Sequence, residues 1–117
     1  MKEFILLFRM NITDKEAQPS REQMEIYMQQ WMRWINFIAD KGQLADGGNH
    51  LSKQGRVLRP NNSITDSPYI SDNISVAGYI MIHAKDLKGA TKIAERCPIL
   101  EGENTSVEIR EIASAEE

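Results

Sequence analysis

The sequence has few of the residues that form disulfides, membrane helices or metal sites. It contains one cysteine, so no disulfide can form within the chain, and we predict a reducing, cytoplasmic location. No run of about 18 apolar residues occurs, which argues against a membrane partner. The two histidines, His50 and His83, lie too far apart in the sequence to show the spacing of metal ligands. We therefore expect no metal site and no cofactor.

An excess of positive charge is also absent. The chain has 14 Lys and Arg residues against 17 Asp and Glu residues, which gives a net charge of -3. Proteins that follow a phosphate backbone usually carry clustered Lys and Arg. Lys53, Arg56 and Arg59 give one segment a small basic side, but three charges usually form a solvated surface. We therefore expect no nucleic-acid partner.

The length and the balance of residue types fit one domain. The chain has 117 residues, of which 41% are hydrophobic and 26% are charged. A chain of this size buries roughly 65% of its extended surface, which is enough for one core. We predict a single domain over residues 1–112 and a polar tail over residues 113–117.

Four segments have the apolar patterns of β-strands, and they lie at residues 3–10, 44–51, 76–84 and 105–112. The first contains five consecutive apolar residues with no small-residue cleavage site after them, so it indicates a strand rather than a signal peptide. Its continuous apolar run also predicts a central strand that is buried on both faces.

Alternation along the last two strands separates two faces of the predicted sheet. In the third strand, one face receives the residues Gly78, Ile80 and Ile82, and the other receives Tyr79, Met81 and His83. In the last strand, Val107 and Ile109 alternate with Glu108 and Arg110. We expect Glu108 and Arg110 to lie on the same face as Tyr79.

Two helices are predicted from their end signals. Ser20 and Gln23 have the spacing of a capping box, which predicts the start of a long helix after Ser20. The helix should run to about residue 41, because Gly42 can adopt the left-handed conformation that ends a helix. Asp86 caps a second, short helix, and Pro98 prevents its continuation. The apolar stripe of the long helix, widened by Tyr27 and Trp34, is predicted to be Met24, Met28, Trp31, Ile35 and Ile38.

A β-hairpin is predicted between the second and third strands, from two short segments at 55–59 and 63–69 with a turn at Pro60. The element order then gives an α+β fold, a ferredoxin-like split βαβ sandwich with an inserted β-hairpin. The helices would cover one sheet face. Because an uncovered face with aromatic and polar residues needs a partner or a ligand, we expect a two-fold homodimer.

Five parts of the chain resemble the YCII-related family, in the branch called DGPF. They are MKEFILLFR at 1–9, YMQQWMRW at 27–34, TDSPY at 65–69, AGY at 77–79 and AERCP at 94–98. The third stands where the branch has its Asp-Gly-Pro-Phe signature. The resemblance implies a dimeric α+β barrel, which is similar to small lyase and isomerase-like proteins. Some members of the family lie beside, or are fused to, transcription sigma factors.

Two parts of the family pattern are altered in this chain. Ser67 and Tyr69 replace the glycine and the phenylalanine of the signature. The wider family has been proposed to use a His-Asp pair, and by register these positions are occupied here by Trp31 and Cys97. The resemblance therefore does not carry that acid–base pair over to this chain.

Two residues are candidates for catalysis. His83 is expected on the uncovered face, and a histidine there could exchange protons near neutral pH. The alternative is that His83 is a polar edge residue whose side chain is hydrogen-bonded to a neighbouring main-chain group. Asp66 precedes Ser67 and Pro68, so it either shapes a turn by accepting main-chain hydrogen bonds, which we favour, or places a carboxylate in a pocket. Cys97 is not expected to act as a nucleophile, because a helix C-terminus raises the pKa of a thiol.

Six further residues are candidates for ligand binding. Arg9 can meet an anionic ligand or form a surface ion pair, and His50 can line the mouth of a pocket or lie in solvent. Trp31 and Trp34 are either core residues or the wall of an aromatic pocket. The remaining two are Tyr69, in the altered signature, and Tyr79, on the uncovered face.

These observations predict a homodimer that binds a small organic molecule, in a pocket between the uncovered sheet face, the hairpin and the partner chain. The first alternative is an enzyme of lyase or isomerase type that uses His83 as its base, with Asp66 or Tyr79 assisting. The second alternative is an interaction module that acts on the transcription machinery.

Overall fold

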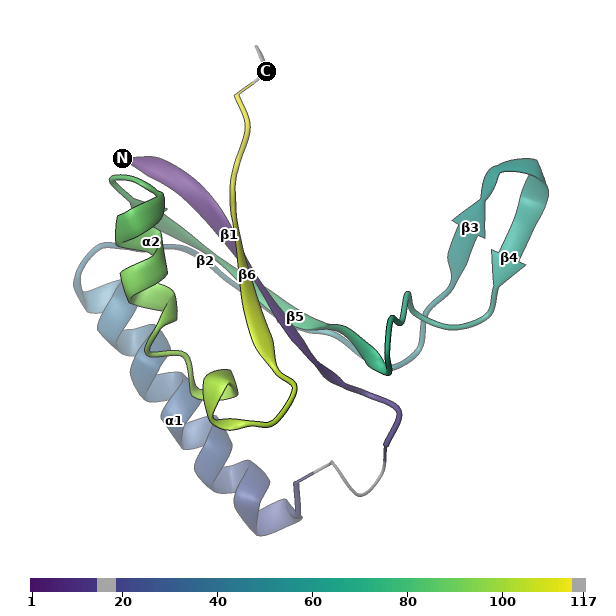
Figure 1. The fold of residues 1–117 in the computed structure, drawn as a ribbon. Helices are drawn as coiled ribbons and strands as arrows, with labels where there is room; N and C mark the ends of the chain where they lie inside the picture. Colours follow the sequence, from purple (N-terminus) through teal and green to yellow (C-terminus); the bar gives the residue numbers. More distant parts are fainter. Residues whose placement is uncertain (15–18, 115–117) are drawn as a thin grey trace.

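The computed structural model describes residues 1–14 and 19–114, and the end of the predicted tail, residues 115–117, lies outside this part. The protein has a mixed α+β fold with two helices on one side of an antiparallel sheet (Figure 1). Neither described helix is both long and apolar enough to cross a membrane. The elements in order are β1 (Lys2–Asn11), α1 (Arg21–Asp40), β2 (Leu44–His50), β3 (Val57–Arg59), β4 (Ser63–Thr65), β5 (Ile74–Ala84), α2 (Leu87–Ala94) and β6 (Ser106–Glu111).

The main sheet has four strands in the order β2-β5-β1-β6, and every neighbouring pair is antiparallel. β1 lies in the interior of the sheet, as its apolar run predicted, and Leu6 is opposite both Ile80 and Ile109. The prediction that β1 is buried on both faces is wrong for the single chain. Phe4, Leu6 and Phe8 are buried under the helices, whereas Ile5 and Leu7 are only half-buried because no described element covers their side.

The helix ends follow the predicted local chemistry. The Ser20 Oγ accepts a hydrogen bond from the Gln23 N–H at 3.2 Å, and the Gln23 Oε1 accepts one from the Ser20 N–H at 2.9 Å. This reciprocal pair satisfies main-chain donors that a helix start leaves unpaired. Gly42 follows the end of α1 with φ of 69°, and the Asp86 carboxylate caps α2 by accepting from the Gly89 N–H at 2.8 Å.

The predicted core stripe of α1 is partly wrong. Trp34 and Ile38 are buried, and Trp31 and Ile35 pack against the core, but Met24 and Met28 are 38% and 53% exposed. Apolar residues cover too wide an arc of this helix for all of them to face the sheet. Trp31 and Trp34 face the sheet instead, because both indoles pack edge-on against Phe8 of β1, with ring centroids 4.7 and 6.0 Å away.

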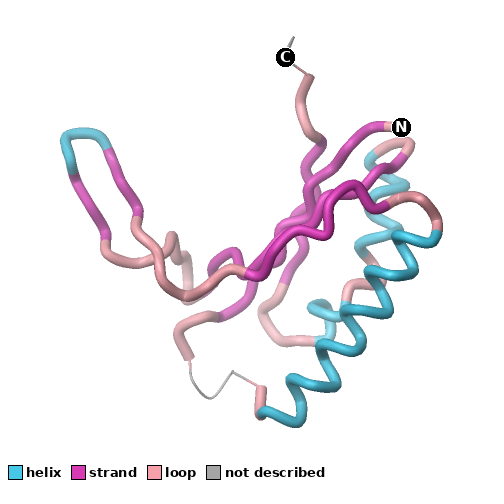
Figure 2. Tube along the Cα trace, turned by 180° about the vertical axis from the view of Figure 1, so that it is seen from behind, coloured by secondary structure: helices cyan, strands magenta, loops and turns pink. Residues whose placement is uncertain are grey.

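β3 and β4 form the predicted hairpin as a separate two-stranded sheet. Its strands are shorter than expected, with Leu58 opposite Ile64, and its turn is a short 3-10 segment, η1 (Pro60–Asn62). The hairpin stands away from the rest of the molecule in both views (Figures 1 and 2). It contributes to a radius of gyration of 15.6 Å, whereas a compact domain of this length has about 13 Å.

Candidate functional site

The surface of the main sheet opposite α1 and α2 is the candidate site, and we call it the open face. No other part of the described chain covers this surface (Figures 1 and 2). Strand register arranges its side chains in rows, since Tyr79 and Glu108 both lie opposite Leu7, and Met81 and Arg110 both lie opposite Ile5. By the same register, the open face includes Glu3, Ile5, Leu7, Arg9, Asp46, Asn49, Val76, Tyr79, Met81, His83, Glu108 and Arg110.

The alternation predicted along β5 is confirmed. Gly78, Ile80 and Ile82 are buried on the helix side, and the residues between them, Tyr79, Met81 and His83, are half-buried on the open face. Together with Ile5 and Leu7 they form a floor of aliphatic, aromatic and polar groups. A sheet surface of this composition suits contact with another apolar surface or with a ligand.

The ion pairs of the open face centre on Glu108. The Arg9 Nη1 donates to Glu108 Oε1, and the Arg110 Nη1 donates to Glu108 Oε2 at 3.4 Å. The hydrogen bond from Arg9 is the main cause that lowers the pKa of Glu108 below its ordinary value, and Arg110 acts in the same direction. Two guanidinium groups therefore share one carboxylate, and the register places two more carboxylates, those of Glu3 and Asp46, on the same face.

Asn49 places a polar group on the edge strand β2, at the opposite edge of the open face from Glu108. It lies opposite Tyr79 in the register, and its Nδ2 donates a hydrogen bond to the Tyr79 Oη at 3.1 Å. The contact depends on irregular pairing of β2, whose register shifts between Leu44 and Asp46 and again between Asp46 and Asn49. Such shifts change which side chains reach a given face, so simple alternation from Leu44 does not identify Asn49.

Replacing Arg9 by methionine should raise the pKa of Glu108 toward the ordinary glutamate value, because the strongest stabilising donor is removed. Carboxyl-carbon NMR titration of Glu108 in both proteins measures this shift, and Arg110→Met should produce a smaller one. In the wild type the pair stabilises the fold above the unfolded-state pKa, and this contribution is lost as the pH falls through the lowered folded-state value. Equal titration midpoints in wild type and Arg9→Met would contradict the assignment.

His83 and Asp66 are not brought together within one chain. The main-chain N–H of His83 donates to the Gln43 carbonyl at 2.7 Å, and its side chain lies opposite Glu3. Asp66 lies beyond the other end of β5, where its Oδ1 accepts from the Arg56 Nε at 2.9 Å rather than shaping a turn through main-chain donors. His83 is nine residues along β5 from Ile74, which corresponds to about 30 Å at the rise of a strand.

The six residues predicted to bind a ligand do not lie together in the structure. Arg9 and Tyr79 lie on the open face, whereas His50 is exposed at the end of β2 and Tyr69 is 70% exposed near the hairpin. Trp31 and Trp34 lie on the helix side of the sheet, where they contact Phe8 and each other. They are core residues in this chain and do not border the open face.

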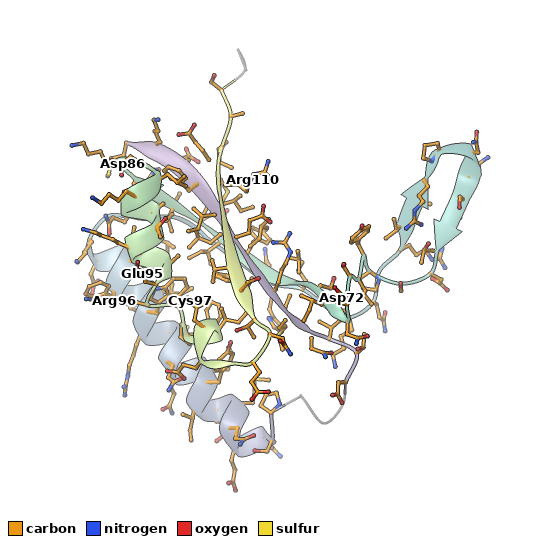
Figure 3. The ribbon with its side chains drawn as sticks, in the orientation of Figure 1. Asp72, Asp86, Glu95, Arg96, Cys97 and Arg110 are labelled. Carbon is orange, nitrogen blue, oxygen red and sulfur yellow. The ribbon has the colours of Figure 1, made fainter. Side chains whose placement is uncertain are left out.

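Two shallow hollows lie elsewhere on the molecule. One, of about 490 Å³, lies between α1 and the segment after α2 and includes Cys97, which Figure 3 shows well apart from Arg110. The other, of about 610 Å³, lies at the base of the hairpin beside Arg56 and Asp66. Among the described residues, no three His, Cys, Asp or Glu side chains are grouped so that they could hold a metal ion.

Cys97 is buried, and this burial raises the pKa of its thiol to about 12. The predicted direction is confirmed, although the main cause is loss of solvent rather than the end of α2. We expect the native thiol to react with a disulfide reagent at pH 8 about 1000-fold more slowly than an unperturbed thiol, because its thiolate fraction is smaller by that factor. Absorbance of the released thiol measures the rate, and equal rates in buffer and in denaturing urea would contradict this prediction.

A comparison of the sequence with models of protein families found no match, and a search of curated proteins found none either. The geometry of the open face is therefore the main indication of what the protein does. The strand alternation already pointed to several of its residues, including Glu108 and Arg110. Ile5 and Leu7 were missed because their strand was expected to be buried on both faces, and Asn49 was missed because the shifts in β2 leave no simple sequence signal.

Proposed function

We propose that the protein is a homodimer that binds a small organic molecule in a pocket over the open face, enclosed by the hairpin and the second copy. The observation that carries this proposal is the half-buried floor of Ile5, Leu7, Tyr79 and Met81 beside the Arg9–Glu108 ion pair, which no described element covers. An ion pair of this kind gains strength when solvent is removed, so a second chain over the floor would make the cluster a specific recognition site.

We also propose the finer fold assignment, a ferredoxin-like sandwich that forms a dimeric α+β barrel. The strand order β2-β5-β1-β6, with α1 and α2 in the two strand–helix–strand halves, supports the sandwich. The uncovered sheet supports the barrel, because two such faces can close on each other about a two-fold axis. The resemblance to the YCII-related family predicts the same assembly. The proposal places this dimer in the cytoplasm, where one buried cysteine stays reduced.

The ligand that this site fits best combines an apolar body with one anionic group. The apolar part would rest on Leu7 and Met81, while the anionic group would meet the guanidinium groups of Arg9 and Arg110, which share the Glu108 carboxylate. Guanidinium groups bind carboxylates through paired hydrogen bonds, which adds direction to the charge attraction. The Tyr79 hydroxyl, fixed by Asn49, supplies a further polar contact.

Two measurements test the proposal together. Sedimentation velocity should show a dimer in dilute buffer, and a thermal-shift screen of small organic acids should give hits that Arg9→Gln abolishes. Arg33→Gln, which changes an exposed arginine on α1, is the control and should keep those hits. A monomer throughout, or hits that survive Arg9→Gln unchanged, would overturn the proposed site.

The lyase or isomerase alternative receives less support from the geometry. His83 and Tyr79 share the open face, but Asp66 is paired with Arg56 at the hairpin base of the same chain. If screening yields a substrate that is turned over, His83→Ala should abolish the turnover. A stable complex with a transcription protein, formed in the absence of any ligand, would favour the interaction-module alternative.

A further inference from the structure

No other element of the described chain packs against the two strands of the hairpin. We call residues 53–66 the arm, which comprises β3, β4, the turn between them and the flanking charged residues. Each of its strands has three residues, and in both views no other described element lies alongside them (Figures 1 and 2). A two-stranded hairpin alone is marginally stable in water and needs a third strand or another packing surface. The arm therefore lacks the packing surface that its structure requires.

The arm exposes its largest apolar side chains. Leu58 is 73% exposed and Ile64 is 56% exposed. They are cross-strand partners, so they lie side by side on one face of the arm. Two large apolar residues that are adjacent in register and turned to solvent form a surface suited to a protein contact.

The charge of the arm differs in sign from that of the remaining chain. The arm contains Lys53, Arg56 and Arg59 against one acidic residue, Asp66. The whole chain has 14 Lys and Arg and 17 Asp and Glu, so the residues outside the arm comprise 11 basic and 16 acidic ones. A net positive arm is therefore complementary to the net negative body of another copy of the same protein.

The base of the arm is held in place, and the arm rises from the end of the sheet on the side opposite the helices without lying over its own open face (Figures 1 and 2). The Leu51 N–H donates to the Ala77 carbonyl at 2.8 Å, and Ser71 and Ile74 exchange two main-chain hydrogen bonds at 2.9 Å. The ion pair between Arg56 and Asp66 joins the two sides of the arm near its base. The arm cannot fold onto its own sheet without breaking these contacts.

We infer that the arm docks on the body of a second copy of this chain, with the Leu58 and Ile64 side against the partner, and that it closes the partner's pocket over the open face. This inference rests on the proposed homodimer. Under two-fold symmetry each chain gives one arm and receives one, so both pockets are completed by the same contact. The site over each open face is then incomplete without residues from the partner's arm.

The test compares two double variants by sedimentation equilibrium. Leu58→Glu with Ile64→Glu charges the arm, and Ile26→Glu with Met32→Glu makes the same chemical change at two exposed apolar positions of α1, 60% and 55% exposed. The arm variant should raise the dimer Kd by about 100-fold, because apolar anchors at an interface dominate its affinity. The α1 variant should leave it within about 3-fold. Far-UV circular dichroism checks that both variants keep the fold.

A second measurement locates the contact in the unaltered protein. Amide hydrogen exchange at residues 57–65 should be at least about 10-fold slower in samples well above the dimer Kd than in samples diluted far below it, because a docked hairpin opens less often. The inference is overturned if the wild type is a dimer but the arm variant dimerises equally well, or if the arm amides of the dimer stay unprotected. Either result leaves the proposed dimer intact. A wild-type protein that is monomeric at all concentrations overturns both.

Discussion

Replacing Gly48 by alanine should lower the free energy of unfolding by about 2–5 kcal/mol. Gly48 has φ of 65°, a conformation that side-chain-bearing residues rarely adopt, and an added Cβ would lie 1.7 Å from the Tyr79 carbonyl oxygen. The overlap is with the backbone of β5, so no side-chain rotation can relieve it. β2 must move away from β5, which should also break the hydrogen bond between Asn49 and Tyr79. Urea unfolding followed by tryptophan fluorescence measures the loss.

The neighbouring glycine provides a matched control for this experiment. A Cβ added at Gly47 meets nothing within 4 Å, and Gly47 does not have a positive φ. Gly47→Ala should therefore change the free energy of unfolding by no more than about 1 kcal/mol. If both alanine variants unfold at the same urea concentration, the close approach of Gly48 to β5 does not describe the protein in solution.

Replacing Trp34 by alanine should cost about 3–5 kcal/mol of stability, the range seen when a large aromatic residue is removed from a core. Trp34 is 5% exposed and packs against Phe8 and Trp31. Its Nε1 also donates a hydrogen bond to the Ile93 carbonyl at 3.1 Å, which ties α1 to α2. The variant loses both the contact area and the link between the helices. Thermal and urea unfolding followed by circular dichroism measure the effect.

Two further variants separate the contributions of Trp34. Trp34→Phe keeps an aromatic ring but removes the donor to the Ile93 carbonyl, so it should cost about 1–3 kcal/mol. Met28→Ala changes a residue of the same helix that is 53% exposed and should have an effect of less than about 1 kcal/mol. A Trp34→Ala protein as stable as Met28→Ala would show that the indole is not a core residue.

The two large effects concern opposite faces of the same sheet. Trp34 fills the side that α1 and α2 cover, while Gly48 allows β2 to approach β5 and so places Asn49 on the open face. Because no element among the described residues covers the open face, changes there should act mainly on assembly and ligand binding. Changes at Trp34 should act on folding first. Comparing unfolding curves with the dimer Kd separates these two outcomes.

Much of the fold was predictable because its signals are local. The capping box of Ser20 and Gln23, the glycine at 42 and the proline at 98 mark chain positions by their own hydrogen bonding and backbone geometry. Alternation along β5 needed only the two-residue period of a strand. The helix stripe failed at Met24 and Met28 because periodicity gives the spacing of a stripe but not its centre, which the packing of Trp31 and Trp34 against Phe8 decides.

The candidate site was predictable only where it follows from alternation. Tyr79, Glu108 and Arg110 reach one surface because their strands alternate in a regular register. The proposed pairing of His83 with Asp66 had no such basis, and the two lie near opposite ends of β5. Their separation depends on where the hairpin leaves the sheet, and no short segment of sequence encodes that direction.

The sequence by itself determined the elements, their order and the two faces of β5 and β6, because these depend on residues that are close along the chain. Only the tertiary structure decided that Arg9 meets Glu108 across 99 positions, that Asn49 reaches Tyr79, and that the hairpin points away from its own sheet. Such contacts join distant parts of the chain, and they depend on how strands shift and helices rotate when the whole core packs.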